Sequence, residues 1–427
     1  MNTCDTQNVR WARPVPVRYR ADVAVVGGGI AGVCAACAAA AAGASVVLVE
    51  RFGVTGGVLT TGGVGNFCGP TAGVGEVFDE VLAGLDAFGA LEDEKPSPDG
   101  ATVRVFEHEI LAVVLQELLG RRGVKLLLHT RFVDALTTGR RVDAAIVCGA
   151  SGPEAVAADV FVDCTGEGCL AHAAGFATMK GREADGLQLP MSMMGFVREA
   201  PEAAAPQVPP GWFDPIRTPG DLPMTSIWPN GPGGKALKIK VPMFDSTDTE
   251  SLTAAEVRGR RRLMEVLDYY QRVEGRPWRY DRCSPIIGIR EGRRIVGDYV
   301  LTVDDLRAGR RFDDAVARGS FYLDGHRPDD EKRTYLLPPE QRRVPPYQIP
   351  LRCLIARDGE NLLMAGRCFS ADQLALSSAR VATTGAMMGQ AAGIAAALAA
   401  RSGGDCRKPD PATVRRTVTQ RSGRLEL

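Results

Sequence analysis

Three glycines and one glutamate near the start of the chain have the types and spacing needed to hold a pyrophosphate and a ribose. Gly27 permits a tight turn, Gly29 lets backbone approach a pyrophosphate, and Gly32 lets a helix pack closely on a sheet. Glu50 follows at roughly the 20-residue spacing at which a carboxylate accepts hydrogen bonds from ribose hydroxyls. The alternative, a glycine-rich turn without a ligand, is disfavoured by the flanking segments. The residues predicted to hold the phosphates are Gly27, Gly29, Ile30, Ala31 and Gly32.

A strand, a turn and a helix must position these residues, and the flanking sequence predicts all three. The apolar run 23–26 predicts a strand, and the alanine- and cysteine-rich segment 30–42 predicts a helix that Gly43 ends. Segment 45–49 predicts a second strand, which places Glu50 at its carboxyl end. The amides at the N-terminus of the helix then face the phosphates. The pattern therefore predicts a dinucleotide-binding βαβ unit.

Two later strands also end in glycine-containing turns, and a glycine-rich loop follows Glu50. Such turns suit close backbone approach to a flat ligand. One pyrophosphate site accompanied by further glycine contacts favours a long flavin dinucleotide over a nicotinamide dinucleotide. The residues of these turns are Gly56, Gly57, Thr165, Gly166, Gly366 and Arg367.

The length and composition are typical of a multidomain globular protein. A chain of 427 residues, 45% of them hydrophobic, predicts about two or three domains. The formal net charge is zero and the arginines are scattered among acids, which argues against nucleic acid or an anionic membrane as a partner. The N-terminal segment lacks the apolar region of a secretory signal and no transmembrane segment is predicted, so we expect a cytoplasmic protein.

The eleven cysteines favour reduced thiols over disulfides, because their number is odd and they are spread over a large chain. Cys34 and Cys37 have the spacing of a redox pair, but they lie in the predicted alanine-rich helix, where close packing is the simpler role. No second CxxC or CxxH pair accompanies them. We therefore predict no metal site.

The character of the chain changes near residue 190 and again near residue 345, and both changes indicate domain boundaries. We predict an α/β fold in which 1–190 and 346–427 form a discontinuous, Rossmann-like, three-layer domain. Residues 191–345 form an inserted α+β substrate or cap domain. Helices are predicted over 75–88, 107–121, 251–272 and 381–400, and strands over 124–129, 141–147, 155–162, 235–244 and 361–364.

Over residues 20–400, these motifs together resemble the FAD-dependent oxidoreductase family that shares the two-domain fold of the glutathione-reductase type. The resemblance rests on VVGGG at 25–29 with Glu50-Arg51, the Gly56-Gly57 loop, DCTGEG at 163–168, IREGRRI at 289–295, AGRC at 365–368 and GQAAG at 389–393. It implies FAD extended along the domain boundary and redox chemistry on a small molecule, without identifying the substrate. It also implies cofactor contacts from Arg51, Gly389 and Gln390, and an adenine contact from Val133.

Hydride transfer to the N5 atom of a flavin needs a substrate held beside the ring, often with a base that takes a proton. Arg290 and Glu291 lie in an arginine-rich cluster, which favours either binding of a carboxylate or phosphate, or a structural ion-pair network. Tyr347 and Arg352 lie where the chain re-enters the first domain and have the same two interpretations.

Two positions depart from the family pattern. Many relatives carry Thr-His where this chain has Asp372-Gln373, and an aspartate where it has Cys169. Asp372 is therefore either a substitute base or a carboxylate that caps a helix or pairs with Arg380. The histidines His108, His129, His172 and His326 are expected to be structural, and Cys68 and Cys368 to be buried more readily than reactive.

The sequence predicts an FAD-dependent oxidoreductase that oxidises a small organic substrate, anionic if the arginine cluster binds it, by hydride transfer to flavin N5. A helix beginning near Thr383-Thr384 would direct its amides at flavin N1 and the C2 carbonyl, or serve packing alone. One alternative is an NAD(P)H-driven reductase or redox-neutral flavoenzyme, although the chain has no second clear GxGxxG. Another is a non-catalytic flavin-binding protein. The sequence is also compatible with a homo-oligomer.

Overall fold

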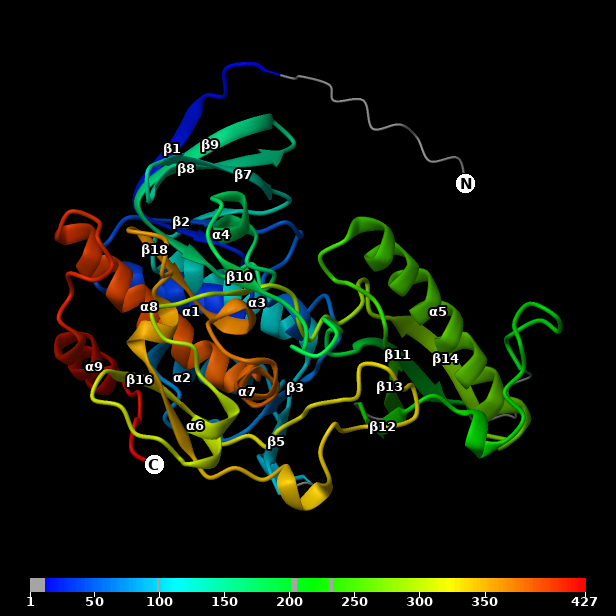
Figure 1. Ribbon diagram of the computed structural model, residues 1–427. Coiled ribbons are helices and arrows are strands. Elements are labelled where there is room, and N and C mark those ends of the chain that lie inside the picture. The colour runs from blue at the N-terminus through cyan, green and yellow to red at the C-terminus, as the bar shows by residue number, and fades with distance from the viewer. Residues whose placement is uncertain (1–11, 98–99, 201–205, 231–232) are drawn as a thin grey trace.

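A mostly parallel sheet forms the centre of the larger domain (Figure 1). The computed structural model describes residues 12–97, 100–200, 206–230 and 233–427. The strand order is β6-β2-β1-β9-β8-β7, and β18 pairs in parallel with the end of β9. The strands are β1 (Val17–Val26), β2 (Val46–Val49), β6 (Lys125–Leu127), β7 (Arg131–Thr138), β8 (Arg141–Gly149), β9 (Gly152–Asp163) and β18 (Leu362–Met364).

Both faces of this sheet are covered, because its central strands carry apolar side chains on both sides. Val23 and Val25 belong to one core cluster with the helices α1 (Ile30–Ala41), α2 (Glu76–Ala87), α3 (His108–Arg121) and α8 (Ala382–Arg401). Ala24 and Val26 belong to a second cluster on the opposite face, with side chains of the β7–β9 layer and of α4 (Cys169–Ala173). The predicted three-layer, Rossmann-like α/β fold is confirmed.

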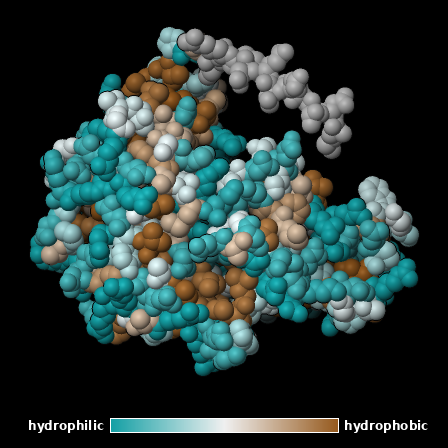
Figure 2. Space-filling view, in the orientation of Figure 1, coloured by the Kyte–Doolittle hydropathy of each residue, from teal (hydrophilic) through white to brown (hydrophobic). Residues whose placement is uncertain are grey.

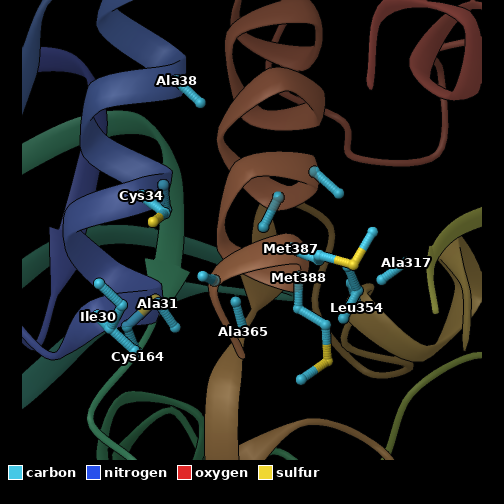
Figure 3. Packing of buried hydrophobic residues seen from close by; sticks show 14 of the residues in the cluster. Ile30, Ala31, Cys34, Ala38, Cys164, Ala317, Leu354, Ala365, Met387 and Met388 are labelled. Atoms are coloured by element: carbon cyan, nitrogen blue, oxygen red, sulfur yellow. The ribbon is translucent and has the colours of Figure 1, made fainter. Parts of the chain in front are cut away.

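The helices α1 and α8 lie side by side at very short range (Figure 3). A side chain at Gly389 would collide with the carbonyl oxygen of Ala31, and one at Gly393 would collide with that of Ala35. Because both positions advance by four residues, the helices run in the same direction. Alignment of Gly389 with Ala31 puts the N-terminus of α8 about 9 Å beyond that of α1 along the helix axis. Glycine at these two positions therefore sets both the approach and the offset of the helix ends.

An antiparallel sheet with one helix behind it forms the second domain (Figure 1). Its strand order is β12-β13-β11-β14. Apolar side chains of β13 on one face pack with those of the helix, whose outward surface is mainly hydrophilic (Figure 2). The opposite face, with Met194 and Phe196, meets Gly63 of the larger domain. The elements are β11 (Met191–Glu199), β12 (Thr225–Pro229), β13 (Gly234–Val241), β14 (Trp278–Cys283) and α5 (Thr249–Arg272).

Part of the segment predicted to lie in the inserted domain packs instead into the core of the larger one. Leu301, Leu306 and Phe312 join the cluster that contains α1 and α8, and β16 pairs with β17. Residues before the predicted domain boundary at 345 therefore already belong to the hydrophobic core of the larger domain. The remaining elements are β3 (Asn66–Cys68), β4 (Lys95–Pro96), β5 (Thr102–Val105), β10 (Thr178–Met179), β15 (Arg294–Ile295), α6 (Val303–Arg307), β16 (Ala315–Gly319), β17 (Tyr347–Pro350), α7 (Gln373–Ala379) and α9 (Pro411–Gln420).

Across the described ranges no single helix is long and apolar enough to cross a membrane; only α7 and α8 together pass that test, and they are bent by 94° at their junction. Among the same residues, no group of three or more histidine, cysteine or acidic side chains is arranged to hold a metal ion. Cys34 and Cys37 are buried free thiols, which packing against neighbouring helices explains.

We expect Gly393→Ala to lower the free energy of unfolding by about 1–3 kcal/mol, because the added methyl group must push α8 away from the Ala35 carbonyl. Urea unfolding followed by circular dichroism measures this. Gly120→Ala is the matched control, since Gly120 is also helical but has open space around its Cα, and alanine there should leave stability unchanged or raise it by up to about 1 kcal/mol. Equal stability of the two variants would contradict the packing role.

Candidate active site

The turn between β1 and α1 leaves an open cradle at the end of the helix. Gly27 has φ +103° and lies against the backbone of Cys164, and a side chain at Gly32 would collide with the carbonyl oxygen of Gly27. Gly29 differs from both, because a side chain there would meet no atom within 4 Å. No side chain caps α1 at Gly29, so the first amides of the helix remain available to an anion. The glycine roles predicted from spacing therefore match the local geometry.

The carboxylate of Glu50 lies beside this cradle. Its oxygens accept hydrogen bonds from Gly28 N at 2.7 Å and from Phe52 N at 2.9 Å, and the residue is 5% exposed. Burial raises the pKa of Glu50, and the two backbone hydrogen bonds oppose that rise. Thr130 N donates to Glu50 O, so the segment after β6 forms the wall of this end of the site. Val133 lies further along, in an irregular part of β7 and 57% exposed.

The glycine-rich loop folds back onto the cradle. Gly56 N donates to Gly28 O at 2.8 Å, and a side chain at Gly57 would lie 3.2 Å from Gly29 Cα. Both residues have positive φ, at +107° and +59°, which explains glycine at each. This loop therefore extends the open backbone surface from the phosphate turn.

The carboxylate of Glu167 links the ends of three parallel strands. Its Oε1 accepts from Arg367 Nη2 at 2.6 Å, and its Oε2 lies 3.8 Å from Arg51 Nη1. Oε2 is buried and has no hydrogen-bond donor in the part of the chain that the structure describes. An orphaned acceptor beside a dinucleotide cradle fits a sugar or ribityl hydroxyl. Gly166 packs directly against the Arg367 guanidinium, and Thr165 Oγ1 donates to Asp163, the buried carboxylate that orders this turn.

The N-terminus of α8 opens on the same side of the sheet. Its N-cap, Val381, provides no side-chain cap, and a side chain at Gly366 would lie 3.0 Å from Ala31 Cβ, between the starts of the two helices. Thr383 Oγ1 donates to Cys68 O at 2.8 Å. A cavity of about 180 Å³ borders this first turn, with walls from 69–74 and 318–321. The free amides of α8 thus face space that could hold an electron-rich ring edge.

Two predicted cofactor residues have other roles in the structure. Gly389 is covered by the backbone of α1, and the Gln390 side chain joins Val77 N to Arg421 O, so both serve packing within the core. Val133 is 57% exposed in an irregular part of β7, and its adenine contact stays a prediction. The structure brings the other predicted cofactor residues together at the carboxyl edge of β1, β2, β9 and β18, where parallel sheets bind ligands.

Four predicted catalytic residues are also engaged elsewhere. Both Glu291 oxygens accept backbone hydrogen bonds, from Gly181 N and Leu189 N at 2.8 Å each, and the carboxylate also binds Arg294 and Gln373. Tyr347 is fully buried against Ser378, and Arg352 pairs with Asp314. Asp372 caps α7 by accepting from Ala375 N at 2.7 Å. These contacts favour the structural interpretation of each residue.

Arg290 is the exception, because it joins a polar cluster between the two domains. Its Nη1 donates to Pro190 O and to Ser192 Oγ, each at 2.7 Å, while its Nε is buried without a partner among the described residues. Burial, with repulsion from Arg380, lowers the pKa of Arg290 to about 9. The cluster also contains Lys238 and Lys240 of β13.

His326 lies in the same cluster, between an acid and a base. Its Nε2 lies 2.9 Å from Lys240 Nζ and 3.1 Å from Asp324 Oδ1, and its Nδ1 contacts Thr334 O. Burial lowers the pKa of both His326 and Lys240. Asp324 Oδ2 in turn accepts from Arg380 Nη2 at 2.5 Å. His326, which was expected to be structural, is thus part of a buried hydrogen-bonded network.

Sequence reasoning missed Lys238, Lys240, Asp324 and His326. Alternation of lysine with Leu237 and Ile239 in β13 was a signal for a strand with one polar face, but not for what that face meets. The loop around His326 has no periodic pattern and carried no signal. Burial raises the pKa of the Cys68 thiol to about 11, and Cys368 is fully buried, so neither is a thiolate at neutral pH.

The uncapped helix ends, the glycine cradle and the ribose-directed carboxylate define a dinucleotide-binding flavoprotein fold. The chain belongs to the family described as FAD dependent oxidoreductase, whose model matches residues 22–418. It is an FAD-dependent enzyme, and FAD fits the cradle, the orphaned Glu167 oxygen and the offset of the two helix ends.

Solved structures share this fold at low sequence identity. One is a geranylgeranyl bacteriochlorophyll reductase-like protein from Thermoplasma acidophilum, with 14% identity, a TM-score of 0.50, and coverage of 94% of this chain and 83% of that one. Another is BexE, from a study of oxidation during BE-7585A biosynthesis, with 17% identity, a TM-score of 0.50, and coverage of 94% and 68%. The comparison with curated proteins gives no match.

We expect Gly29→Val to fold normally and to bind FAD roughly 100-fold or more weakly, a loss of about 2.7 kcal/mol, because its side chain enters the open cradle. Titration of apoprotein with FAD, followed by flavin fluorescence, measures the affinity, and circular dichroism reports folding. Gly120→Val adds the same side chain in open space on α3 and should bind FAD normally. Wild-type affinity in Gly29→Val would contradict the assignment of this cradle.

The affinity for FAD should also fall with acidification. Burial raises the pKa of Glu50, so its carboxylate takes up a proton at a higher pH than a freely exposed glutamate does, and protonation removes an acceptor for the ribose hydroxyls. Titrations between about pH 7 and about pH 5 should show this loss in the wild-type protein. Glu50→Gln should bind more weakly at neutral pH and vary less with pH. Parallel pH profiles for the two proteins would argue against a ribose contact.

Proposed function

We propose that this enzyme oxidises a small organic substrate by hydride transfer to the N5 atom of FAD. The observation that carries the proposal is the polar cluster between the inserted sheet and the larger domain: Arg290 and the β13 lysines act on one another and on Arg380, which precedes the N-cap of α8. Bound FAD supplies the electron-accepting ring. The enclosed position excludes bulk water from the substrate.

The protein itself would contribute fixed dipoles and a proton acceptor. The free amides at Ala382 and Thr383 begin a helix of 20 residues, and their partial positive charge favours the negative charge that a flavin gains on reduction. His326 is held next to Lys240, and burial lowers the pKa of both side chains, which favours the neutral form of each. We assign the proton lost from the substrate to this pair.

Other parts of the prediction remain proposals of the same kind. The glutathione-reductase-type arrangement is supported by the insertion of the four-stranded sheet between segments of the larger domain. Family membership favours an enzyme over a non-catalytic flavin-binding protein. The NAD(P)H-driven or redox-neutral alternative draws no support from a second glycine motif. A cytoplasmic location and a homo-oligomer stay predictions.

Anaerobic mixing of the FAD-loaded protein with small alcohols, amines and hydroxy acids tests the proposal. We expect at least one class to reduce the flavin within the time of a turnover, seen as loss of oxidised-flavin absorbance. His326→Gln should slow that reduction roughly 100-fold, the usual scale for loss of a positioned base. Reduction by NADH or NADPH alone, with none by the organic panel, would replace substrate oxidation with the reductase alternative.

A further inference from the structure

The inner face of the inserted sheet places two lysines at the domain boundary. In β13 the side chains of Leu237 and Ile239 pack with α5, so Lys238 and Lys240, which alternate with them, lie on the opposite face. Lys240 is 2% exposed. Lys238 lies above the Trp228 ring, with Nζ 5.6 Å from its centroid, and has no ion-pair partner among the described residues. Lys238 therefore presents a half-buried ammonium group that can bind an anion.

Two arginines reach the same place from other segments. Arg290 is anchored to Ser192, which is opposite Lys240 in the sheet, and is 8% exposed. Arg380 precedes the N-cap of α8 and pairs with Asp324. The Nε atoms of both arginines are buried and have no hydrogen-bond partner in the described part of the chain. Two guanidinium donors are therefore still unused inside the protein.

The charges of the cluster do not balance. Asp324 is the carboxylate that acts on Lys238, Lys240 and Arg290, whereas four basic side chains, Arg380 among them, share the site, so the basic groups outnumber this acid even when Lys240 is neutral. Burial, with repulsion from Arg290 and Arg380, lowers the pKa of each lysine. Uncompensated charge in a buried site is costly, and it is retained where a ligand of opposite charge binds.

The position of the cluster connects it to the cofactor end of the site. Arg380 is one residue from Val381, where α8 begins, and Lys238 acts electrostatically on Cys68, whose carbonyl binds Thr383 of the first turn. The cluster is therefore next to the helix end assigned to the flavin ring, and it is separated from the phosphate cradle by the offset between α8 and α1.

We propose that Lys238, Arg290 and Arg380 bind the carboxylate of an organic-acid substrate and hold it beside the FAD. This inference rests on the proposed function and names the chemical class of its substrate. The arginine fork matches the two oxygens of a carboxylate, and the lysine adds a third charge-assisted hydrogen bond. The Lys240–His326 pair, adjacent to these groups, remains available for the proton.

Binding of unreactive carboxylates tests the site without turnover. The FAD-loaded full chain is titrated with acetate and benzoate, and with the neutral acetamide and benzamide of the same shape, by calorimetry and by the shift of the flavin absorbance. We expect both carboxylates to bind and perturb the flavin spectrum, and both amides to bind at least tenfold more weakly. Equal binding of acid and amide, or no binding of either acid, would overturn the proposal.

Lys238→Met tests the residues, because it removes a cation without breaking an ion pair. We expect acetate affinity to fall roughly tenfold or more while the thermal unfolding midpoint and the flavin spectrum stay as in the wild type. Arg122→Gln is the matched control, since Arg122 is also largely buried but pairs with Glu76 and Glu80 on α2 and should leave acetate binding unchanged. Unchanged acetate affinity in Lys238→Met would refute the assignment.

Two further outcomes separate this inference from the proposed function. Inorganic phosphate that binds more tightly than the carboxylates would replace the carboxylate with a phosphate and overturn the class named here. A neutral substrate that reduces the flavin equally well in wild type and Lys238→Met would also overturn it, while the oxidation itself would stand. Failure of every substrate to reduce the flavin, with carboxylate binding intact, would count against the proposed function instead.

Discussion

The close contact between α1 and α8 is the constraint on which the rest of the site depends. Glycine at 389 and 393 lets the two backbones approach until a single methyl group would not fit. The helices are parallel and offset by about 9 Å along their axes. Their N-termini therefore face the same edge of the sheet, but one lies about 9 Å beyond the other. One helix end can then serve the phosphates and the other the ring of a single extended cofactor.

The polar groups of this enzyme fall into two sets that differ in hydrogen bonding. Asp163, Glu291 and Asp372 are filled by backbone amides, so they fix turns and helix starts and have little capacity for a ligand. A Glu167 oxygen and the Nε atoms of Arg290 and Arg380 are buried and have no hydrogen-bond partner among the residues that the structure describes. These atoms lie along the surfaces assigned to cofactor and substrate. A bound ligand could supply the hydrogen-bond partner that each of them lacks.

The two faces of the inserted sheet have different roles: one packs in the core of its domain, and the other carries the groups proposed to bind substrate. One face is apolar and packs on α5, which gives the domain its hydrophobic core. The other combines Met194 and Phe196 with the β13 lysines and meets the larger domain. The core that receives residues 299–325 ties the end of the insertion back to α1 and α8. The position of the polar face over the cofactor end is therefore set by packing on both sides of it.

The βαβ unit, the glycine roles and the family could be predicted from the residues alone, because local turns, helix periodicity and the Gly27-to-Glu50 spacing act over short distances. The packing roles of Gly389 and Gln390 could be recognised only in the folded chain, because they depend on neighbours far away in the sequence. The hydrogen bonds of the folded chain also identify Asp372 as a cap. The tertiary structure also shows that Lys238, Arg290, His326 and Arg380 share one cluster. These residues come from segments without a common motif, and long-range packing of strand, loop and helix end brings them together.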